Sequence, residues 1–401
     1  MISLARFNPH WQEGFFYDIP VERDFVNQLK KDLNNRLILG TFGLRRVGKT
    51  TGLKQLIDCL IKNGVERKNI LFYSFDDSSE IMDVIERYES IIGKPISQDN
   101  VLIFDEINYA RNWKAQLKVV YDLYKPRIFI SGSQSALIKK EMISLAGRIK
   151  ELAVTPLTFT EFLRFKGKEY LSNSPEAKDE FSRYLKRQFP ETLFMEIEDA
   201  EAYYESIYKK VIYEDIPRIF NIKEGNIIES VFKVITEKPG ILLSINELSK
   251  EFGINRNKLS LIVNALEKTF LIKKIYNFST NRITSEKKLK KFYTLPSFAN
   301  SGEDLLVESY IATLPNIKFF WRSKSKNEVD FIYKNCAIEV KYRNAVLKKD
   351  LRGLISFTEK HKKFNPVVIK KADSKTFPKE INSRKIMYLD PWDFESRILT
   401  Q

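Results

Sequence analysis

The chain contains little cysteine and no long apolar run. Its 401 residues include two cysteines, Cys59 and Cys336, and each lies within an apolar stretch. Two such cysteines cannot build a disulfide framework or a zinc cluster, so we expect a reducing compartment. No stretch approaches the roughly 18 apolar residues of a membrane helix, and the N-terminus lacks the apolar core of a signal peptide. We therefore predict a cytoplasmic protein with no membrane partner.

Positive charge is in excess and unevenly distributed. The formal net charge is +15, and residues 282–401 hold 25 Lys and Arg against 14 Asp and Glu. A basic C-terminal third favours a polyanionic partner, with DNA first. A lysine-rich solvated surface is the alternative explanation, and charge alone does not separate the two.

Apolar runs alternate with amphipathic segments through residues 1–155. The runs are continuous, as strands buried on both faces require, and this alternation is typical of a parallel sheet covered by helices on both faces. We therefore predict an α/β fold for this part of the chain. Strands are expected at 37–42, 70–75, 101–104, 127–130 and 149–154, and helices near 49–62, 80–92, 112–124 and 134–143.

Residues 156–222 are predicted to form a helical subdomain, and residues 223–281 a separate winged-helix-like domain. In the latter, a helix over 226–237 ends at Pro239-Gly240, Ser244 and Asn255 can cap two further helices, and an extended segment follows. The third helix carries Arg256 and Lys258 near its start, where a recognition helix contacts DNA. Packing on neighbouring domains without DNA contact is the alternative. The lysine-rich segment 280–291 is expected to be a linker.

The strongest motif is a phosphate-binding loop at residues 43–50. GLRRVGKT fits the Walker A pattern G-x-x-x-x-G-K-[ST], with an expected strand before it and an expected helix after it. Glycines let the backbone amides point at phosphate oxygens, and the helix N-terminus adds its positive dipole end. The pattern predicts a MgATP site lined by Gly43, Leu44, Arg45, Arg46, Val47, Gly48, Lys49, Thr50 and Thr51. Lys49 is expected at the β- and γ-phosphates, and Thr50 at Mg²⁺.

A second motif supplies two acids. The apolar strand VLIF is followed by Asp105, expected to hold Mg²⁺ through water, and Glu106, expected to polarise the attacking water as a general base. The expected strand 70–75 lies between the two motifs, which is typical of ATPases with such a glutamate. A kinase of the same loop class, or two acids in a surface loop, are the alternatives.

Two further residues are candidates for contact with the γ-phosphate. The expected strand ending at Ile130 continues into Ser131-Gly132-Ser133, and we favour Ser133 over Ser131 as a γ-phosphate sensor. Arg148 is a candidate for stabilising transition-state charge, in its own subunit or in a neighbouring one. A bond to a carbonyl or to a surface acid is the alternative for Arg148, so the oligomeric state stays open. Arg45 and Arg46 can also pair with acids or with a partner.

A hairpin near the C-terminus carries a second constellation. A turn at Lys334-Asn335 places Asp330 directly opposite Glu339, with Lys341 on the same face. Opposed carboxylates repel unless a cation lies between them, so a Mg²⁺ or Mn²⁺ site with Glu308 as a third carboxylate is one interpretation. The other is that Lys341 forms salt bridges with both acids.

Together these segments resemble a widespread prokaryotic family of AAA-type P-loop ATPases. The resemblance lies in GLRRVGKT, VLIFDEI, ISGSQS and LAGR followed by PLTFTEFL. Many members carry a C-terminal domain of unknown function related to the PD-(D/E)xK nuclease superfamily, and KFYTLPSFAN, GEDLLVESYIATL, NEVDFIY and AIEVKYR are similar to it. The resemblance implies a mixed α/β restriction-endonuclease-like domain at 282–401. It implies a metal-dependent site at Glu308, Asp330, Glu339 and Lys341.

Two functions follow as hypotheses. The first is an ATPase that acts on DNA and whose nucleotide state gates a metal-dependent nuclease domain. The second is a regulatory ATPase switch whose nuclease-like domain binds a protein or nucleic acid partner without cleaving it. A translocating motor ranks last, because the sequence shows no dedicated strand-separating element.

Overall fold

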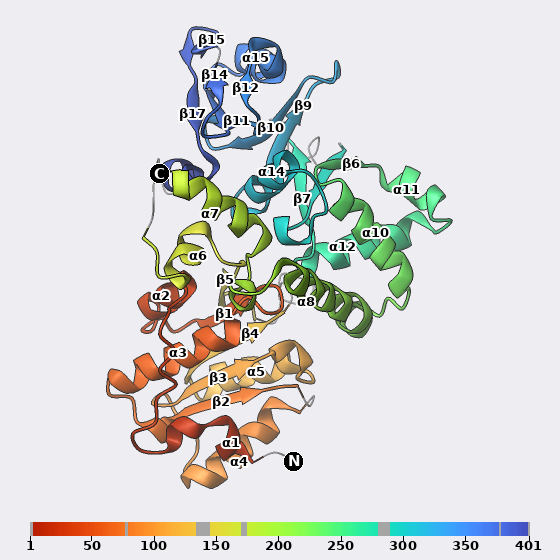
Figure 1. The fold of residues 1–401 in the computed structure, drawn as a ribbon. Helices are drawn as coiled ribbons and strands as arrows, with labels where there is room; N and C mark the ends of the chain where they lie inside the picture. Colours follow the sequence, from red (N-terminus) through yellow and green to blue (C-terminus); the bar gives the residue numbers. More distant parts are fainter. Residues whose placement is uncertain are drawn as a thin grey trace. The chain divides into compact units, whose positions relative to one another are not determined.

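The computed structural model describes residues 3–76, 79–133, 145–169, 175–279, 289–376 and 378–399. The chain divides into two compact units, residues 1–167 with 189–191 and residues 168–188 with 192–401 (Figure 1). The helix expected over 134–143 lies outside the described residues. Within them, no helix combines the length and the apolar character needed to cross a bilayer.

A parallel five-stranded sheet forms the centre of the first unit. Its order is β2-β3-β4-β1-β5, so β4 lies between β1 and β3. The strands are β1 (Ile38–Phe42), β2 (Ile70–Ser74), β3 (Val101–Asp105), β4 (Arg127–Gly132) and β5 (Ile149–Ala153). The predicted parallel sheet is confirmed, and each strand begins and ends within two residues of its expected bounds.

Helices cover both faces of this sheet. The chain runs from β1 to the far edge through α3 (Lys49–Lys62), then returns through α4 (Ile81–Ile92) and α5 (Trp113–Leu123). Because such crossovers are right-handed, α3 lies on one face and α4 and α5 lie on the other. Helix α2 (Asp24–Lys31) packs against α3, and α4 packs against α5. The short helices α1 (Leu4–Phe7) and α6 (Phe159–Phe165) complete the unit.

The N-terminal segment protects the exposed edge of β2. The buried side chain of Asn8 donates to the Phe72 carbonyl at 3.0 Å and accepts from the Phe72 N–H at 2.6 Å. The rings of His10 and Trp11 contact the Ile70 carbonyl at 3.1 and 2.7 Å. Unpaired edge strands can pair with other chains, and these side chains take the place of a sixth strand.

The second unit begins with helices. They are α7 (Pro175–Lys186), α8 (Ile197–Lys210), α9 (Ile216–Phe220), α10 (Gly225–Glu237), α11 (Ile245–Glu251) and α12 (Arg256–Lys268). Helix α6 belongs to the first unit, so the helical subdomain expected at 156–222 is divided between the two units. The expected caps form: Ser244 Oγ accepts from the Glu247 N–H, and Asn255 Oδ1 accepts from the Asn257 N–H.

Three short strands accompany α10 to α12. They are β6 (Ile241–Leu243), β7 (Lys273–Asn277) and β8 (Lys290–Tyr293). Strand β8 pairs antiparallel with both β6 and β7. The linker expected over 280–291 is therefore wrong at Lys290 and Lys291, which form the start of β8; residues 280–288 are outside the described residues.

These strands continue into the C-terminal sheet. The order of its eight strands is β17-β13-β11-β10-β9-β7-β8-β6, with both parallel and antiparallel pairs. The remaining strands are β9 (Phe319–Arg322), β10 (Glu328–Tyr333), β11 (Cys336–Lys341), β13 (Asn365–Lys370) and β17 (Met387–Leu389). The boundary expected at 281/282 thus falls inside one continuous sheet.

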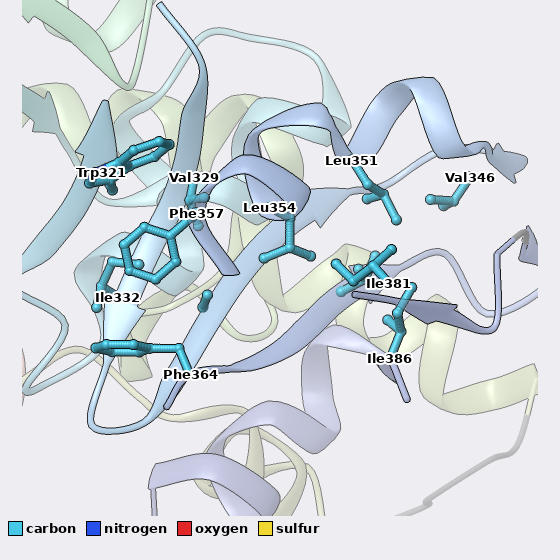
Figure 2. Packing of buried hydrophobic residues seen from close by; sticks show 12 residues of the cluster. Trp321, Val329, Ile332, Val346, Leu351, Leu354, Phe357, Phe364, Ile381 and Ile386 are labelled. Carbon is cyan, nitrogen blue, oxygen red and sulfur yellow. The ribbon is translucent and has the colours of Figure 1, made fainter. Parts of the chain in front are cut away.

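Helix α15 (Arg352–Lys360) covers part of this sheet. Its Leu354 and Phe357 are fully buried, and Figure 2 shows Phe357 beside Val329, Ile332 and Phe364. Helix α14 (Glu303–Thr313) also packs against the sheet. Two small two-stranded sheets complete the unit. They are β12 (Ala345–Val346) with β14 (Lys375–Thr376), and β15 (Glu380–Ile381) with β16 (Arg384–Lys385).

Candidate functional site

The phosphate loop joins the carboxyl end of β1 to the first turn of α3. At Gly43 an added Cβ would lie 1.9 Å from the Val154 carbonyl oxygen, so only glycine fits beside the end of β5. Gly48 has φ +88°, which glycine adopts without strain. The two glycines of the motif are therefore explained by close approach at one end of the loop and by backbone conformation at the other.

Lys49 lies inside the loop. Its side chain is buried, and Nζ donates to the carbonyls of Gly43 and Leu44 at 3.0 and 2.9 Å. Phosphate oxygens are stronger acceptors for an ammonium than carbonyl oxygens because they carry charge. The lysine is thus held at the position from which it can exchange these carbonyls for phosphate.

Asp105 accepts hydrogen bonds from two hydroxyl groups. Thr50 Oγ1 donates to Asp105 Oδ2 at 2.7 Å, and Ser131 Oγ donates to Asp105 Oδ1. The same Ser131 oxygen accepts from the Glu106 N–H at 3.3 Å. The preference for Ser133 as the γ-phosphate sensor stays a prediction. On β4, Ser131 contacts Asp105, whereas Ser133 is buried without a hydrogen-bond partner among the described residues.

Glu106 has an unusual backbone conformation. Its φ is +49° and its ψ is 42°, in the left-handed region that non-glycine residues seldom adopt. Such strain is typical of residues at functional sites. Glu106 lies at the end of β3, and it lines the same cavity as the phosphate loop.

That cavity has a volume of about 470 Å³. Among the expected nucleotide-binding residues, Gly43, Leu44 and Val47 do not line it, and the side chains of Leu44 and Val47 are buried in the core. The expected residues that line it are Arg45, Arg46, Gly48, Lys49, Thr50, Thr51, Asp105 and Glu106. Arg45 also donates to the Tyr109 hydroxyl.

Arg148 lies away from this cavity. It immediately precedes β5, which runs parallel to β1, whereas the phosphate loop follows the other end of β1. At about 3.3 Å per residue, five residues place these two edges of the sheet roughly 16 Å apart. The guanidinium binds Asp122 Oδ1 and Oδ2 at 2.9 and 3.1 Å. The expected contact of Arg148 with the γ-phosphate of its own subunit is therefore corrected; a role toward a neighbouring copy stays a prediction.

Sequence reasoning missed a buried ion pair behind the loop. Arg23 Nε and Nη2 donate to the two carboxylate oxygens of Glu161 at 2.8 and 3.0 Å, and Nη1 donates to the Val47 carbonyl. Glu161 also forms a capping box with Thr158 at the start of α6. The T-F-T-E spacing of a capping box was the available signal for Glu161; Arg23 carried none.

A second group of charged side chains lies in the second unit. The β10–β11 hairpin pairs Phe331 with Ile338 and Tyr333 with Cys336, which confirms the expected turn and places Asp330 beside Glu339. Lys341 Nζ lies 2.6 Å from Glu339 Oε1 and 3.8 Å from Asp330 Oδ2. The sequence therefore predicted this part of the cluster correctly.

Strand β8 adds two side chains that the sequence reasoning did not include. Lys291 Nζ lies 2.6 Å from Glu328, 3.4 Å from Glu308 and 3.6 Å from Asp330. The Tyr293 hydroxyl donates to Glu308 Oε1 at 2.6 Å. The expected linker concealed Lys291, whereas Tyr293 follows the linker in the segment KFYTLPSFAN and was given no role.

Burial and neighbouring charges shift the proton affinities in this cluster. Burial and the adjacent Asp330 raise the pKa of Glu339 to about 8. Burial alone would raise the pKa of Asp330, but Lys341 and Lys291 hold it below its usual value. Burial would lower the pKa of Lys291, but Tyr293, Glu308 and the other acids raise it well above its usual value. Lys291 is therefore a permanent cation within a group of acids.

The acids of this cluster do not fit a metal ion in this arrangement. Within the described ranges, no group of three or more His, Cys, Asp or Glu side chains is placed to hold one. The carboxylates contact lysine ammonium groups instead. A cavity of about 520 Å³ adjoins the cluster and is lined by Glu303, Asp304, Glu308, Val340, Lys341, Tyr342 and Arg343.

Family comparisons agree with this division of the chain. Residues 35–163 match the model of an AAA domain, which, with the parallel sheet and phosphate loop, makes the first unit an AAA-type P-loop ATPase fold. Residues 179–297 and 302–388 match two domains of unknown function (DUF8612 and DUF4143). The first of these ends after β8, which differs from the expected boundary at 281/282. Neither model names a function, so the nuclease resemblance stays a prediction.

Curated relatives are similar over most of the chain. An uncharacterized protein of Methanocaldococcus jannaschii, MJ1637, is 27% identical over 321 residues, which are 72% of this chain and 66% of the relative. An uncharacterized protein of Haemophilus influenzae is 26% identical over 262 residues, 63% of this chain and 65% of the relative. The chain thus spans about two thirds of the length of these relatives.

Solved structures give a weaker likeness. The Thermotoga maritima RuvB Holliday junction branch migration motor is 16% identical with a TM-score of 0.32, covering 64% of this chain and 91% of RuvB. AMPPCP-bound DnaA from Aquifex aeolicus is 14% identical with a TM-score of 0.30, covering 65% and 92%. Both TM-scores are too low for the likeness to bear on function.

Proposed function

We propose that the first unit binds MgATP and hydrolyses it. The observation that carries this proposal is the 2.7 Å contact between Thr50 Oγ1 and Asp105 Oδ2 beside the buried Lys49. A hydroxyl and a carboxylate oxygen are ligands that Mg²⁺ prefers, so the residues fit the ion. Thr50 would hold Mg²⁺ directly and Asp105 through water, and the ion would neutralise charge on the phosphates.

The protein's own residues divide the remaining work. Lys49 and the amides of the loop bind the β- and γ-phosphates and orient them. Glu106 accepts the proton of the attacking water through its carboxylate, while its left-handed backbone fixes the position of that carboxylate at the cavity. Ser131 holds the Asp105 side chain and the Glu106 backbone at once.

Steady-state ATP hydrolysis with and without Mg²⁺ tests this proposal. Replacing Glu106 by Gln keeps the shape of the side chain and removes the base, so we expect turnover to fall about 10²–10⁴-fold with ATP binding retained. Replacing Lys49 by Ala should weaken ATP binding as well. Undiminished turnover in Glu106→Gln would remove Glu106 from the mechanism, and ATP binding unaffected by Lys49→Ala would contradict the site itself.

We further propose that the second unit binds DNA through a winged-helix-like arrangement of α10 to α12 with β6 to β8. Its support is the element order and the pairing of β8 with both β6 and β7. Arg256 is exposed at the start of α12, whereas Lys258 is 2.5 Å from Glu224. Stimulation of ATP hydrolysis by double-stranded DNA would support this proposal; unchanged turnover and no DNA binding would contradict it.

For the C-terminal sheet, one observation favours a binding module over a nuclease. Lys291 and Lys341 contact the same carboxylates that a catalytic metal would need. We therefore favour the regulatory switch, in which nucleotide state changes partner binding without strand cleavage. Incubation of supercoiled DNA with Mg²⁺ or Mn²⁺ distinguishes the two. Cleavage that is lost in Glu339→Ala would establish the nuclease and overturn the switch.

A further inference from the structure

Lys291 reaches the carboxylate cluster from a strand of the α10–α12 region. It lies on β8, and its side chain is 5% exposed. The ammonium group lies 5.6 Å from the ring centroid of Phe320 on β9 and within 3.6 Å of carboxylates from α14 and β10. A buried ammonium so far from solvent is stable only where acids compensate its charge.

Lys291 and Lys341 approach different oxygens of the Asp330 carboxylate. Lys291 Nζ lies 3.6 Å from Asp330 Oδ1, and Lys341 Nζ lies 3.8 Å from Asp330 Oδ2. Arg322 adds a third cation at 2.8 Å from Glu328. Among the described residues, three cations therefore contact the four carboxylates of the cluster, which are Glu308, Glu328, Asp330 and Glu339.

One carboxylate oxygen in the cluster lacks a partner. Glu339 is 5% exposed, and its Oε2 has no hydrogen-bond partner among the described residues, although Oε1 contacts Lys341. An unpaired buried carboxylate oxygen is costly, so the cluster retains the capacity to accept a cation. The ammonium group of Lys291 forms ion pairs with the other three acids, Glu308, Glu328 and Asp330. A metal ion would need carboxylate oxygens from the same acids.

We propose that Lys291 is a built-in cation that keeps this cluster free of divalent metal, and that withdrawing it creates a metal-binding site at Asp330, Glu339 and Glu308. Strand β8 pairs with β6 and β7, so Lys291 belongs to the sheet of the proposed DNA-binding region.

This inference is tested by measuring the binding of Mn²⁺ alone to the full chain, with electron paramagnetic resonance as the readout. All proteins carry Asp105→Asn, which removes the carboxylate that would hold Mg²⁺ in the proposed ATP site, so that Mn²⁺ binding there is weakened equally in every protein compared. Lys291→Met keeps the length of the side chain and removes its charge. We expect it to bind one Mn²⁺ at least tenfold more tightly than its parent, with the gain lost when Asp330→Asn is added.

The neighbouring lysine on the same strand provides the matched control. Lys290→Met removes an equal charge, and Lys290 approaches the Tyr276 ring rather than the cluster, so we expect no gain in Mn²⁺ affinity. If Lys291→Met does not fold, Lys291→Met with Glu328→Gln takes its place in the same comparison, because Glu328 pairs with Lys291 at 2.6 Å and is not one of the three proposed metal ligands. Equal Mn²⁺ affinity of parent and variant, whether tight or absent, would overturn the inference.

Discussion

Ser131 connects the two acids that follow the apolar core of β3. Its hydroxyl donates to Asp105 and accepts from the Glu106 N–H, so a single side chain orients the carboxylate of one acid and the backbone of the other. A hydroxyl flanked by a donor and an acceptor has its own proton position fixed. That arrangement makes Ser131 a positioning residue for the proposed hydrolysis.

Replacing Ser131 by Ala should lower kcat for ATP hydrolysis about tenfold, which corresponds to about 1.4 kcal/mol. KM for ATP should change little, because the phosphate loop is untouched. The comparison is Ser133→Ala, measured in the same assay. A larger loss in Ser133→Ala than in Ser131→Ala would contradict the positioning role of Ser131 and support Ser133 as the γ-phosphate sensor.

His10 makes the stability of the first unit dependent on pH. Burial lowers its pKa to about 4, and the adjacent Arg67 also lowers it, while the bond to Ile70 and the charge of Asp58 act in the opposite direction. Nε2 faces the Ile70 carbonyl at 3.1 Å and must donate, which leaves Nδ1 to accept from Tyr17. The folded state therefore holds the neutral ring.

The folded pKa lies below the unfolded value of about 6.5, so protonation favours unfolding, and stability falls as pH decreases from about 6.5 towards 4. Between pH 7 and pH 5 we expect a loss of about 2 kcal/mol from this residue. Urea denaturation at the two pH values measures the loss. His10→Gln retains a donor and an acceptor without titrating, and its stability should change less over the same interval; equal changes would contradict the prediction.

At the scale of elements, the pattern of apolar residues predicted most helices and strands of the first unit. The features that it missed depend on contacts between residues far apart in the sequence. Strands β2, β3 and β4 were predictable because each contains a continuous apolar run, and α3 begins at Lys49 as the motif requires. The Asp330–Glu339 register followed from one hairpin turn. Lys291 was missed because a lysine beside a polar segment resembles a linker unless the partner acids from α14 and β10 are known.

The Arg23–Glu161 pair joins three elements of the first unit. It connects the start of α2, the phosphate loop at Val47 and the start of α6. Both side chains are at least 95% buried. Burial alone would raise the pKa of Glu161, but Arg23 keeps it below its usual value. The pair therefore stays ionised and holds the loop from behind.

Removing one partner of this pair should be costly, because it leaves the other charge buried without compensation. We expect Arg23→Met and Glu161→Gln each to destabilise the first unit by about 3–5 kcal/mol, and Arg23→Met to raise KM for ATP. The double variant should lose less free energy of unfolding than the sum of the losses in the two single variants. Urea denaturation, with hydrogen exchange to assign the transition to the first unit, measures this; strict additivity would show that the pair is not coupled.

At the scale of the whole chain, the ATPase core was predictable and the boundary at 281/282 was not. Motifs identified the ATPase core, since its chemistry requires particular residues at fixed spacing. The boundary at 281/282 depended on composition, and composition does not reveal that β8 pairs with strands on both sides of the polar segment. Sheet pairing is decided by the entire unit, so a local reading of the sequence could not place that limit.

Binding of the whole chain to DNA should depend on the position of Arg256 as well as on its charge. Arg256 is exposed at the start of α12, where the proposed DNA-binding arrangement would contact a phosphate or a base. Replacing it by Ala should weaken DNA binding and reduce the slope of log affinity against log salt by about 0.9 for a phosphate contact. ATP hydrolysis without DNA should be unchanged.

Lys94→Ala is the matched control, since it removes one positive charge from an exposed position of the first unit. Fluorescence anisotropy with a labelled duplex over a salt series gives both slopes. A general electrostatic attraction would change the two variants equally, whereas a defined contact at α12 changes only Arg256→Ala. Equal slopes in the two variants would therefore assign DNA binding to the overall charge of +15 and remove α12 from the interface.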